Sequence, residues 1–262
     1  MSPPTDAAIL RTHDLTLRYG SLTAVDSVTL EIARGARHAL IGPNGAGKSS
    51  LFAVLAGRTR ATSGTVHLEG QDITQLGEAR RARAGLVRTF QHSSLFLGMS
   101  VLDNVWAAVE RSSGSPVRAW PSPRRDRAIR DAAMTHLENV GLADRHAALC
   151  GALSHGERRQ VEVAMVLACD PRLILLDEPT AGMSVAETEL FASLVESLPR
   201  TVTVVVVEHD LDVVFRLAER VSVLAAGRLI ADGSPEAVRA DDAVQEAYLG
   251  RSAGTELFEV SS

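Results

Sequence analysis

Cysteine is nearly absent from this sequence, and neither sign of charge dominates it. Cys150 and Cys169 are the two cysteines among 262 residues, and neither shows metal-ligand spacing. We therefore expect reduced, buried thiols in a cytosolic protein, without a disulfide framework or a zinc site. The formal net charge of −5 combines interspersed charges of both signs without a basic tail, which argues against nucleic acid as the main partner.

Long apolar runs are also missing. The purely apolar runs, of which 204–207 is an example, have the length of a strand, whereas a membrane span needs about 20 apolar residues. Residues 1–8 lack a basic flank followed by an apolar stretch, so we expect no signal peptide. A chain of 262 residues suits one large domain or two small ones with a substantial core. We expect a chain that does not itself enter the membrane.

The sequence does contain a complete phosphate-binding pattern, G-x-x-x-x-G-K-[ST]. Its glycines allow a tight loop whose N–H groups point at phosphate, its lysine reaches the β- and γ-phosphates, and the next hydroxyl ligates Mg²⁺. Residues 37–41 fit a buried strand before the loop and residues 49–56 a helix after it, so the positive helix end faces the phosphates. The predicted nucleoside triphosphate site comprises Gly42, Pro43, Asn44, Gly45, Ala46, Gly47, Lys48, Ser49 and Ser50.

Alternating apolar and polar residues precede this loop. The alternation over 9–32 predicts antiparallel strands joined by a turn that contains Gly20. Tyr19 lies at that turn, where an aromatic ring can stack on adenine. Ordinary packing of a strand-end tyrosine is the alternative interpretation when this residue is considered alone.

The middle of the chain is helical in character. Residues 79–83 carry a basic run that we expect to form a solvated helix face, and 85–90 predicts a buried strand that ends before Gln91. Two segments with helical spacing follow, joined by the Ser/Pro-rich stretch 112–123. We interpret 91–151 as a helical subdomain inserted into an α/β core.

A capped helix and a pair of acids come next. Ser154 precedes a predicted helix, and Glu157 lies three residues on, the spacing of a capping box. A buried strand over 173–177 delivers Asp177 and Glu178 to its carboxyl end, where ligands bind in open α/β sheets. Asp177 suits Mg²⁺ held through water, and Glu178 suits a general base for an attacking water.

A histidine ends the following predicted strand. The strand over 201–207 leads to Glu208 and His209, which places His209 at the same sheet edge as Gln91 and Glu178. A histidine at a strand end is more often without a function, so this position alone leaves its role open.

Together these motifs, in this order, resemble the ATP-binding subunits of ABC transporters over residues 11–250. The resemblance implies an α/β fold, a P-loop NTPase (RecA-like) core with an N-terminal antiparallel β subdomain and an inserted helical subdomain. Residues 1–262 then form a single ATP-binding domain, with the core in 1–90 and 152–250, the helical subdomain in 91–151 and a tail in 251–262. The family motifs are aromatic-loop Tyr19, Walker A Gly42–Ser50, Gln-loop Gln91, signature Leu153–Glu157, Walker B Leu173–Asp177, catalytic Glu178 and switch His209.

The resemblance also implies the cofactors and the chemical roles. ATP and Mg²⁺ are the expected cofactors, with Ser49, Gln91 and Asp177 at the metal. Glu178 and His209 are the expected catalytic residues. Two subunits, identical or paralogous, are expected to sandwich ATP between the Walker motifs of one and the signature helix of the other.

The signature differs from the family's usual Leu-Ser-Gly-Gly-Gln. Ser154 and Gly156 retain the expected contacts with the γ-phosphate of ATP held by the second subunit. His155 places an imidazole where a glycine is usual, and Glu157 replaces an amide with a carboxylate near phosphate. Ser184 stands where the family has an aspartate, so we expect the two sites to communicate through a different hydrogen bond.

Within the family, the chain is similar to the branched-chain amino acid importer ATPases in segments 88–92, 95–96, 103–105, 207–210 and 246–250. That similarity implies separate membrane permeases, an extracytoplasmic solute-binding protein, and a cytoplasmic position on the inner face of the cell membrane. Relatives for urea, short amides and lipopolysaccharide export share much of this pattern and remain alternatives.

Two other classes of protein also use a phosphate loop. A soluble ABC-type ATPase acting on nucleic acid or ribosomes usually carries a second nucleotide unit, a coiled coil or a zinc insertion, and this sequence shows none of them. A self-contained P-loop kinase or GTPase leaves Ser154 and Gly156 without a nucleotide role. We therefore favour the transporter interpretation over both.

Overall fold

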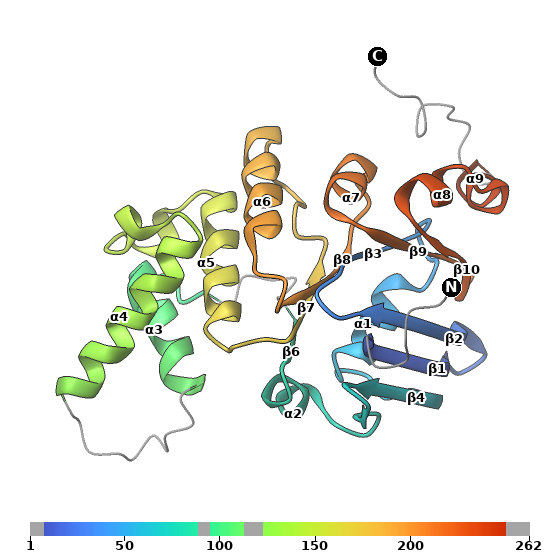
Figure 1. The fold of residues 1–262 in the computed structure, drawn as a ribbon, viewed down its shortest axis with the longest axis horizontal. Helices are drawn as coiled ribbons and strands as arrows, with labels where there is room; N and C mark the ends of the chain where they lie inside the picture. Colours follow the sequence, from blue (N-terminus) through green and yellow to red (C-terminus); the bar gives the residue numbers. More distant parts are fainter. Residues whose placement is uncertain (1–7, 89–94, 113–122, 250–262) are drawn as a thin grey trace.

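The computed structural model describes residues 8–88, 95–112 and 123–249. The first sheet is antiparallel and covers one end of the molecule (Figure 1). Its strand order is β2-β1-β4-β5, as the alternation over 9–32 predicts for the first pair. The strands are β1 (Ala8–Tyr19), β2 (Leu22–Ala33), β4 (Ser63–Leu68) and β5 (Gln71–Asp72).

The second sheet has six strands in the order β10-β9-β3-β8-β7-β6. All neighbours from β9 to β6 pair in parallel, and β10 runs antiparallel to β9. The carboxyl ends of β3, β8, β7 and β6 therefore meet at one edge of the sheet. The strands are β3 (Arg37–Ile41), β6 (Leu86–Arg88), β7 (Leu173–Asp177), β8 (Thr203–Val207), β9 (Arg220–Ala225) and β10 (Arg228–Gly233).

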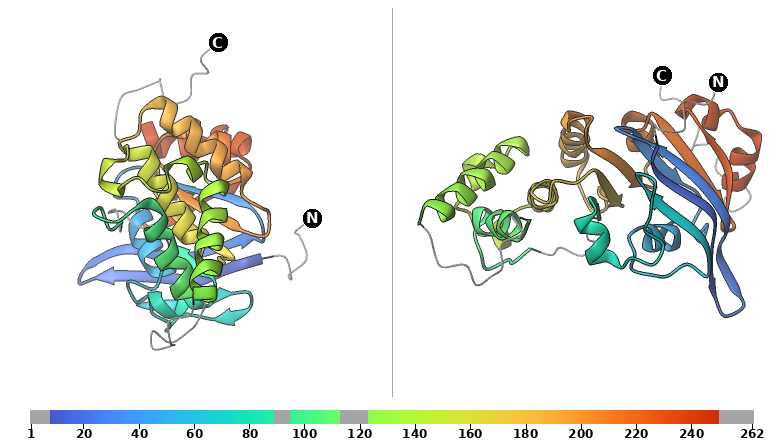
Figure 2. Two further views of the ribbon diagram at one scale, coloured as in Figure 1. Left: turned by 90° about the vertical axis from the view of Figure 1, so that its left-hand side faces the viewer. Right: turned by 60° about the horizontal axis from the view of Figure 1, so that its bottom comes forward.

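Helices lie on both faces of this sheet, and a further group of helices packs at one end of the molecule. Helices α3 and α4 pack beside α5 at the end of the molecule opposite the antiparallel sheet (Figure 1, Figure 2). The helices are α1 (Lys48–Leu55), α2 (Glu78–Arg83), α3 (Val101–Ser112), α4 (Pro123–Asn139), α5 (His155–Leu167), α6 (Val185–Ser197), α7 (Leu211–Leu217), α8 (Pro235–Arg239) and α9 (Asp242–Leu249), with short 3₁₀ turns at Ala143–Arg145 and Cys150–Ala152. Among the described residues, no helix combines the length and the apolar character that crossing a bilayer demands.

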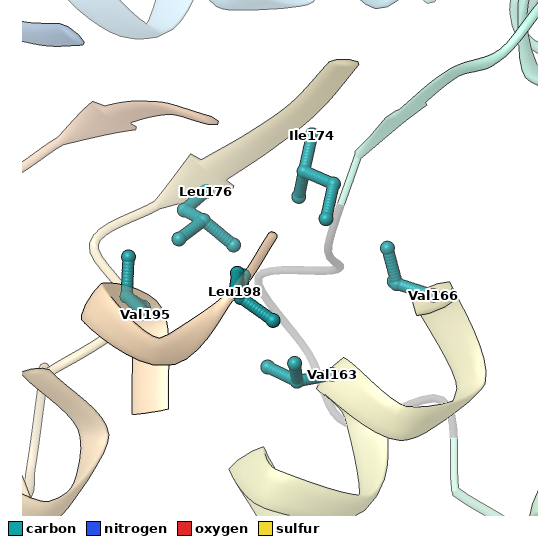
Figure 3. A pocket seen from close by; sticks show the side chains of 6 residues that line it. All are labelled: Val163, Val166, Ile174, Leu176, Val195 and Leu198. Carbon is teal, nitrogen blue, oxygen red and sulfur yellow. The ribbon is translucent and has the colours of Figure 1, made fainter. Parts of the chain in front are cut away.

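The parallel strands separate two apolar cores. In β7, Ile174 and Leu176 face the core that includes helices α5 and α6, whereas Leu173 and Leu175 face the core that includes α1 and the antiparallel sheet. This alternation places α1 and α5 on opposite faces of the sheet. A small pocket beneath α5 and α6 is lined only by apolar side chains, so it offers nothing to a nucleotide (Figure 3): Val163, Val166, Ile174, Leu176, Val195 and Leu198.

The expectation that the basic run 79–83 forms a solvated face is wrong at Arg81, which is 1% exposed. Its Nη1 donates to the carbonyls of Val54 (2.8 Å) and Leu55 (2.7 Å), at the end of α1. Burial lowers the pKa of Arg81 to about 10, so the guanidinium keeps its charge at neutral pH. Arg81 therefore caps the negative end of the helix that follows the phosphate loop.

Both cysteines are free thiols, and the expected burial is confirmed for Cys150 alone. Cys150 is fully buried and Cys169 is partly buried. Burial raises the pKa of both thiols above the ordinary value, so neither has the thiolate character of a reactive cysteine. The tail over 251–262 lies outside the described residues.

Candidate nucleotide-binding site

The phosphate loop begins at the carboxyl end of β3 and is held open by glycines in conformations that other residues rarely adopt. Gly42 and Gly47 have φ angles of 149° and 102°, and Gly47 is the N-cap of α1. A Cβ at Gly42 would lie 2.1 Å from the Leu224 carbonyl oxygen, and one at Gly47 would lie 2.2 Å from that of Ala24. Glycine is therefore required by both backbone strain and close packing.

We expect Gly47→Ala to lower the free energy of unfolding by about 3 kcal/mol or more, because a left-handed φ costs about 1–3 kcal/mol and the clash with Ala24 adds to it. Gly70→Ala is the matched control, since Gly70 has φ 78° and nothing lies within 4 Å of an added Cβ. The control should lose only about 1–2 kcal/mol. Denaturant unfolding of both variants checks this. Equal losses would show that the contact with Ala24 is unimportant.

Lys48 is the first residue of α1 and is buried within the loop. Its Nζ donates to the carbonyl oxygens of Gly42 (2.6 Å) and Pro43 (3.1 Å). The pKa of Lys48 is lowered by burial, and the Glu178 carboxylate offsets only part of this shift. A phosphate oxygen is a stronger acceptor for the Lys48 ammonium than these two carbonyl oxygens. Ser49 follows as an exposed residue of the first turn.

Asp177 ends β7 and is buried in an ion pair with Arg88 of β6. The Arg88 guanidinium donates to Oδ2, while Oδ1 is buried and has no hydrogen-bond partner among the described residues. A buried carboxylate oxygen without a donor suits a hydrated cation, so the site fits the expected Mg²⁺. Arg88 was not identified from the sequence as part of this site.

Glu178 follows Asp177 and adopts a left-handed backbone with φ 44°. Its N–H donates to the Val207 carbonyl (2.8 Å) on the neighbouring strand, and its own carbonyl accepts from Ala181 N–H (3.2 Å). Strained backbone of this kind persists when surrounding contacts hold it, and it is common at functional sites. The conformation turns the partly buried Glu178 out of the strand.

Glu208 is a buried acid that sequence reasoning did not select. It lies 1% exposed after β8, where its Oε1 accepts from Thr180 N–H (2.9 Å) and Oγ1 (2.6 Å). Its Oε2 accepts from the His209 N–H (3.0 Å). Glu208 therefore ties the loop after Glu178 to the histidine, whose side chain is 64% exposed. The signal available in the sequence was an acid next to His209 at the end of an apolar strand.

The remaining predicted nucleotide contacts are only partly described. Tyr19 is the last residue of β1, is 51% exposed, and pairs with Leu22 at the start of β2. The same strand β2 brings Ala24 against Gly47, so Tyr19 lies at the end of the hairpin that touches the phosphate loop. Gln91 lies outside the described residues.

The signature residues lie at the start of α5, the helix that packs on the opposite face of the sheet from α1. Ser154 is the N-cap, and the predicted capping box is confirmed: Glu157 N–H donates to Ser154 Oγ (3.2 Å), and Ser154 N–H donates to Glu157 Oε2 (2.8 Å). Arg145 pairs with the other carboxylate oxygen at 3.1 Å. The extra negative charge of Glu157 is thus turned back on its own helix and neutralised, while Ser154 remains exposed and Gly156 buried.

This arrangement agrees with comparisons to known proteins. A family model described as "ABC transporter" matches residues 25–181, and one described as "Branched-chain amino acid ATP-binding cassette transporter" matches residues 228–254. The chain is 36% identical over 251 residues to the high-affinity branched-chain amino acid transport ATP-binding protein BraF of Pseudomonas aeruginosa, covering 93% of this chain and 98% of that protein. LivG of Escherichia coli strain K12 shows the same identity and coverage.

More distant relatives and solved structures agree on the fold. The lipopolysaccharide export ATP-binding protein LptB of Acidithiobacillus ferridurans is 35% identical over 243 residues, which is 92% of this chain and 97% of that protein. The crystal structure of an ATP-binding cassette of an ABC transporter in its ADP conformation superposes with a TM-score of 0.80 at 29% identity, covering 93% of this chain and 99% of that one. The predicted α/β P-loop fold is confirmed, and the chain belongs to the ATP-binding subunits of ABC transporters.

Proposed function

We propose that this chain hydrolyses ATP in sites shared with a second ATP-binding subunit and thereby drives an importer of branched-chain amino acids. The observation that carries the proposal is the division of the site between the two faces of one sheet. Helix α1, which follows the phosphate loop, packs on one face, and helix α5, which begins after Ser154, packs on the other. A chain divided in this way completes its site with a second copy or a paralogue.

In the proposed mechanism, Lys48 exchanges its carbonyl partners for β- and γ-phosphate oxygens, and the N–H groups at the start of α1 bind the phosphates. Glu178 takes the proton of the attacking water. His209 contacts the γ-phosphate from the end of the next strand, and Tyr19 stacks on the adenine.

The proposed metal set is Ser49, Gln91 and Asp177. When bound, Mg²⁺ neutralises the charge that develops on the transferred phosphoryl group. Arg88 holds one oxygen of Asp177, and the other, Oδ1, would be available to the ion or to its water. Ser154, Gly156 and Glu157 belong to the signature that meets the partner's nucleotide.

We also propose a domain organisation for the chain. Residues 1–262 form one ATP-binding domain, in which 1–90 and 152–250 make the nucleotide-binding core and 91–151 the helical subdomain. The chain acts on the cytoplasmic face of the membrane beside separate permeases, with an extracytoplasmic binding protein as an indirect partner. The names of the relatives BraF and LivG support branched-chain amino acids as the solute. The LptB match keeps lipopolysaccharide export as the second candidate.

An exposed apolar patch, most of which follows shortly after Gln91 in the sequence, is the proposed permease contact. Phe96, Leu97, Met99 and Leu149 are 59%, 48%, 37% and 54% exposed. The buried Asn104 side chain fixes the segment, since its Oδ1 accepts from Phe96 N–H (2.8 Å) and its Nδ2 donates to the Phe96 carbonyl (3.2 Å). A rigid apolar patch of this kind suits a helix of a membrane partner.

We expect Phe96→Asp to abolish uptake while the purified subunit keeps its ATPase activity within about twofold, because a carboxylate in an apolar contact is left unpaired. Leu190→Asp, at an apolar residue that is 63% exposed on α6, is the matched control. Uptake of labelled leucine, isoleucine and valine is measured in cells that carry each variant in place of the wild type. Retained uptake with Phe96→Asp contradicts the docking site. Normal uptake of these amino acids in cells that lack this protein contradicts the proposed solute.

A further inference from the structure

A carboxylate from a neighbouring helix occupies the start of the signature helix. Glu187, in the first turn of α6, accepts a hydrogen bond from the Gly156 N–H through Oε1 at 3.0 Å. Its Oε2 accepts from Ser184 N–H (3.0 Å) and Oγ (2.9 Å), closing the capping box of α6. The Ser184 N–H and the Gly156 N–H, with a further contribution from the Ser154 side chain, lower the pKa of Glu187 to about 2.

The glycine of the signature makes this contact possible. A Cβ at position 156 would lie 2.9 Å from Cγ of Glu187 and 3.0 Å from its Oε1. Glu157, the acid within the signature itself, is turned to Ser154 N–H and Arg145, so it leaves the Gly156 N–H to Glu187. The Gly156 N–H that Glu187 engages is one of the donors assigned above to the partner's γ-phosphate, and the nearby Ser154 hydroxyl is the other.

We infer that Glu187 is a positioning residue that holds the signature donors in the isolated subunit and is displaced when the γ-phosphate of the partner's ATP arrives. The inference rests on the proposed shared site. The Glu187 carboxylate and a γ-phosphate cannot accept from the same donors at once, and their like charges repel at close range. Glu187 retains its bonds to Ser184 when it turns away, so the displaced carboxylate keeps donor partners at the start of its own helix. Glu187 thus links Ser184, the residue that replaces the family's aspartate, to the signature glycine Gly156.

The first test concerns the contact itself and uses the monomer without nucleotide. Amide hydrogen exchange at Gly156 should be slow in the wild type and at least about tenfold faster in Glu187→Ala, since the N–H loses its acceptor. Ser184→Ala is the matched control, because it removes the same α6 cap and leaves Oε1 on Gly156. Its Gly156 exchange should stay within about threefold of wild type. Equal exchange rates in Glu187→Ala and wild type would overturn the inference.

The second test concerns displacement. In a Glu178→Gln background with ATP and Mg²⁺, sedimentation equilibrium should show that Glu187→Ala dimerises about tenfold more tightly, the scale of one charge-assisted hydrogen bond. Ser184→Ala should dimerise within about threefold of its parent. Where the chain does not pair with itself, the second ATP-binding subunit of its transporter is added.

The outcomes separate this inference from the proposed function. Unchanged or weaker dimerisation of Glu187→Ala, with a parent that does dimerise, overturns the displacement and leaves the shared site intact. If neither the parent nor any variant dimerises with ATP, the shared site itself is wrong, and the inference falls with it.

Discussion

Glu178→Gln should slow ATP hydrolysis by about 10²–10⁴-fold, the usual cost of losing a general base, while ATP affinity changes by less than a few-fold. The amide has the shape of the carboxylate, so the left-handed backbone held by Val207 and Ala181 persists. The phosphate loop and Lys48 are untouched, so nucleotide binding survives. Loss of turnover without loss of binding indicates an interaction that is made in the transition state.

Steady-state phosphate release and equilibrium binding of a fluorescent ATP analogue, measured on the same preparation, test this expectation. Glu196→Gln is the control, because Glu196 is an acid on α6 that pairs with Arg216 on the surface. That variant should hydrolyse ATP within about twofold of wild type. Hydrolysis by Glu178→Gln at the wild-type rate would show that another group takes the proton.

The second large effect concerns association. Blocking hydrolysis should accumulate an ATP-bridged dimer, so Glu178→Gln with ATP and Mg²⁺ should run as a dimer on size exclusion. Adding Ser154→Arg should abolish that dimer, because a long cation cannot fit where the N-terminus of α5 meets phosphate. Monomeric ATP affinity should stay within a few-fold, since α1 and α5 pack on opposite faces of the sheet.

Ser154→Ala provides the matched control for size. It removes the hydroxyl and the helix cap, at a cost of about 1 kcal/mol in stability, but leaves the space free. We expect a weaker dimer rather than none, and circular dichroism checks that both variants remain folded. A double mutant that still dimerises, or a Ser154→Arg variant that loses monomeric ATP binding, would rule out the shared site.

Local features of this protein were set by its sequence. The strand Arg37–Ile41, the glycines of the phosphate loop and the helix that begins at Lys48 are adjacent in the chain, so spacing alone predicts them. The capping box of Ser154 and Glu157 depends on residues three apart, and it forms as expected. The position of Asp177 and Glu178 could be predicted because a buried strand ends at Asp177.

Contacts between distant segments depended on the tertiary structure. Arg88 reaches Asp177 because β6 pairs with β7, and Glu208 reaches Thr180 because β8 lies beside β7. Neighbouring strands in this sheet are far apart in the sequence, so no local sequence pattern encodes their order.

Charge patterns were the least informative part of the sequence. The run 79–83 could not reveal that Arg81 turns inward to the α1 carbonyls, because a charge run is usually a solvated face. Glu187 was not singled out from the sequence, and only the packing of α5 on α6 brings it to Gly156. Spacing along the chain determines which groups exist at a helix end, and only packing determines which charge reaches them.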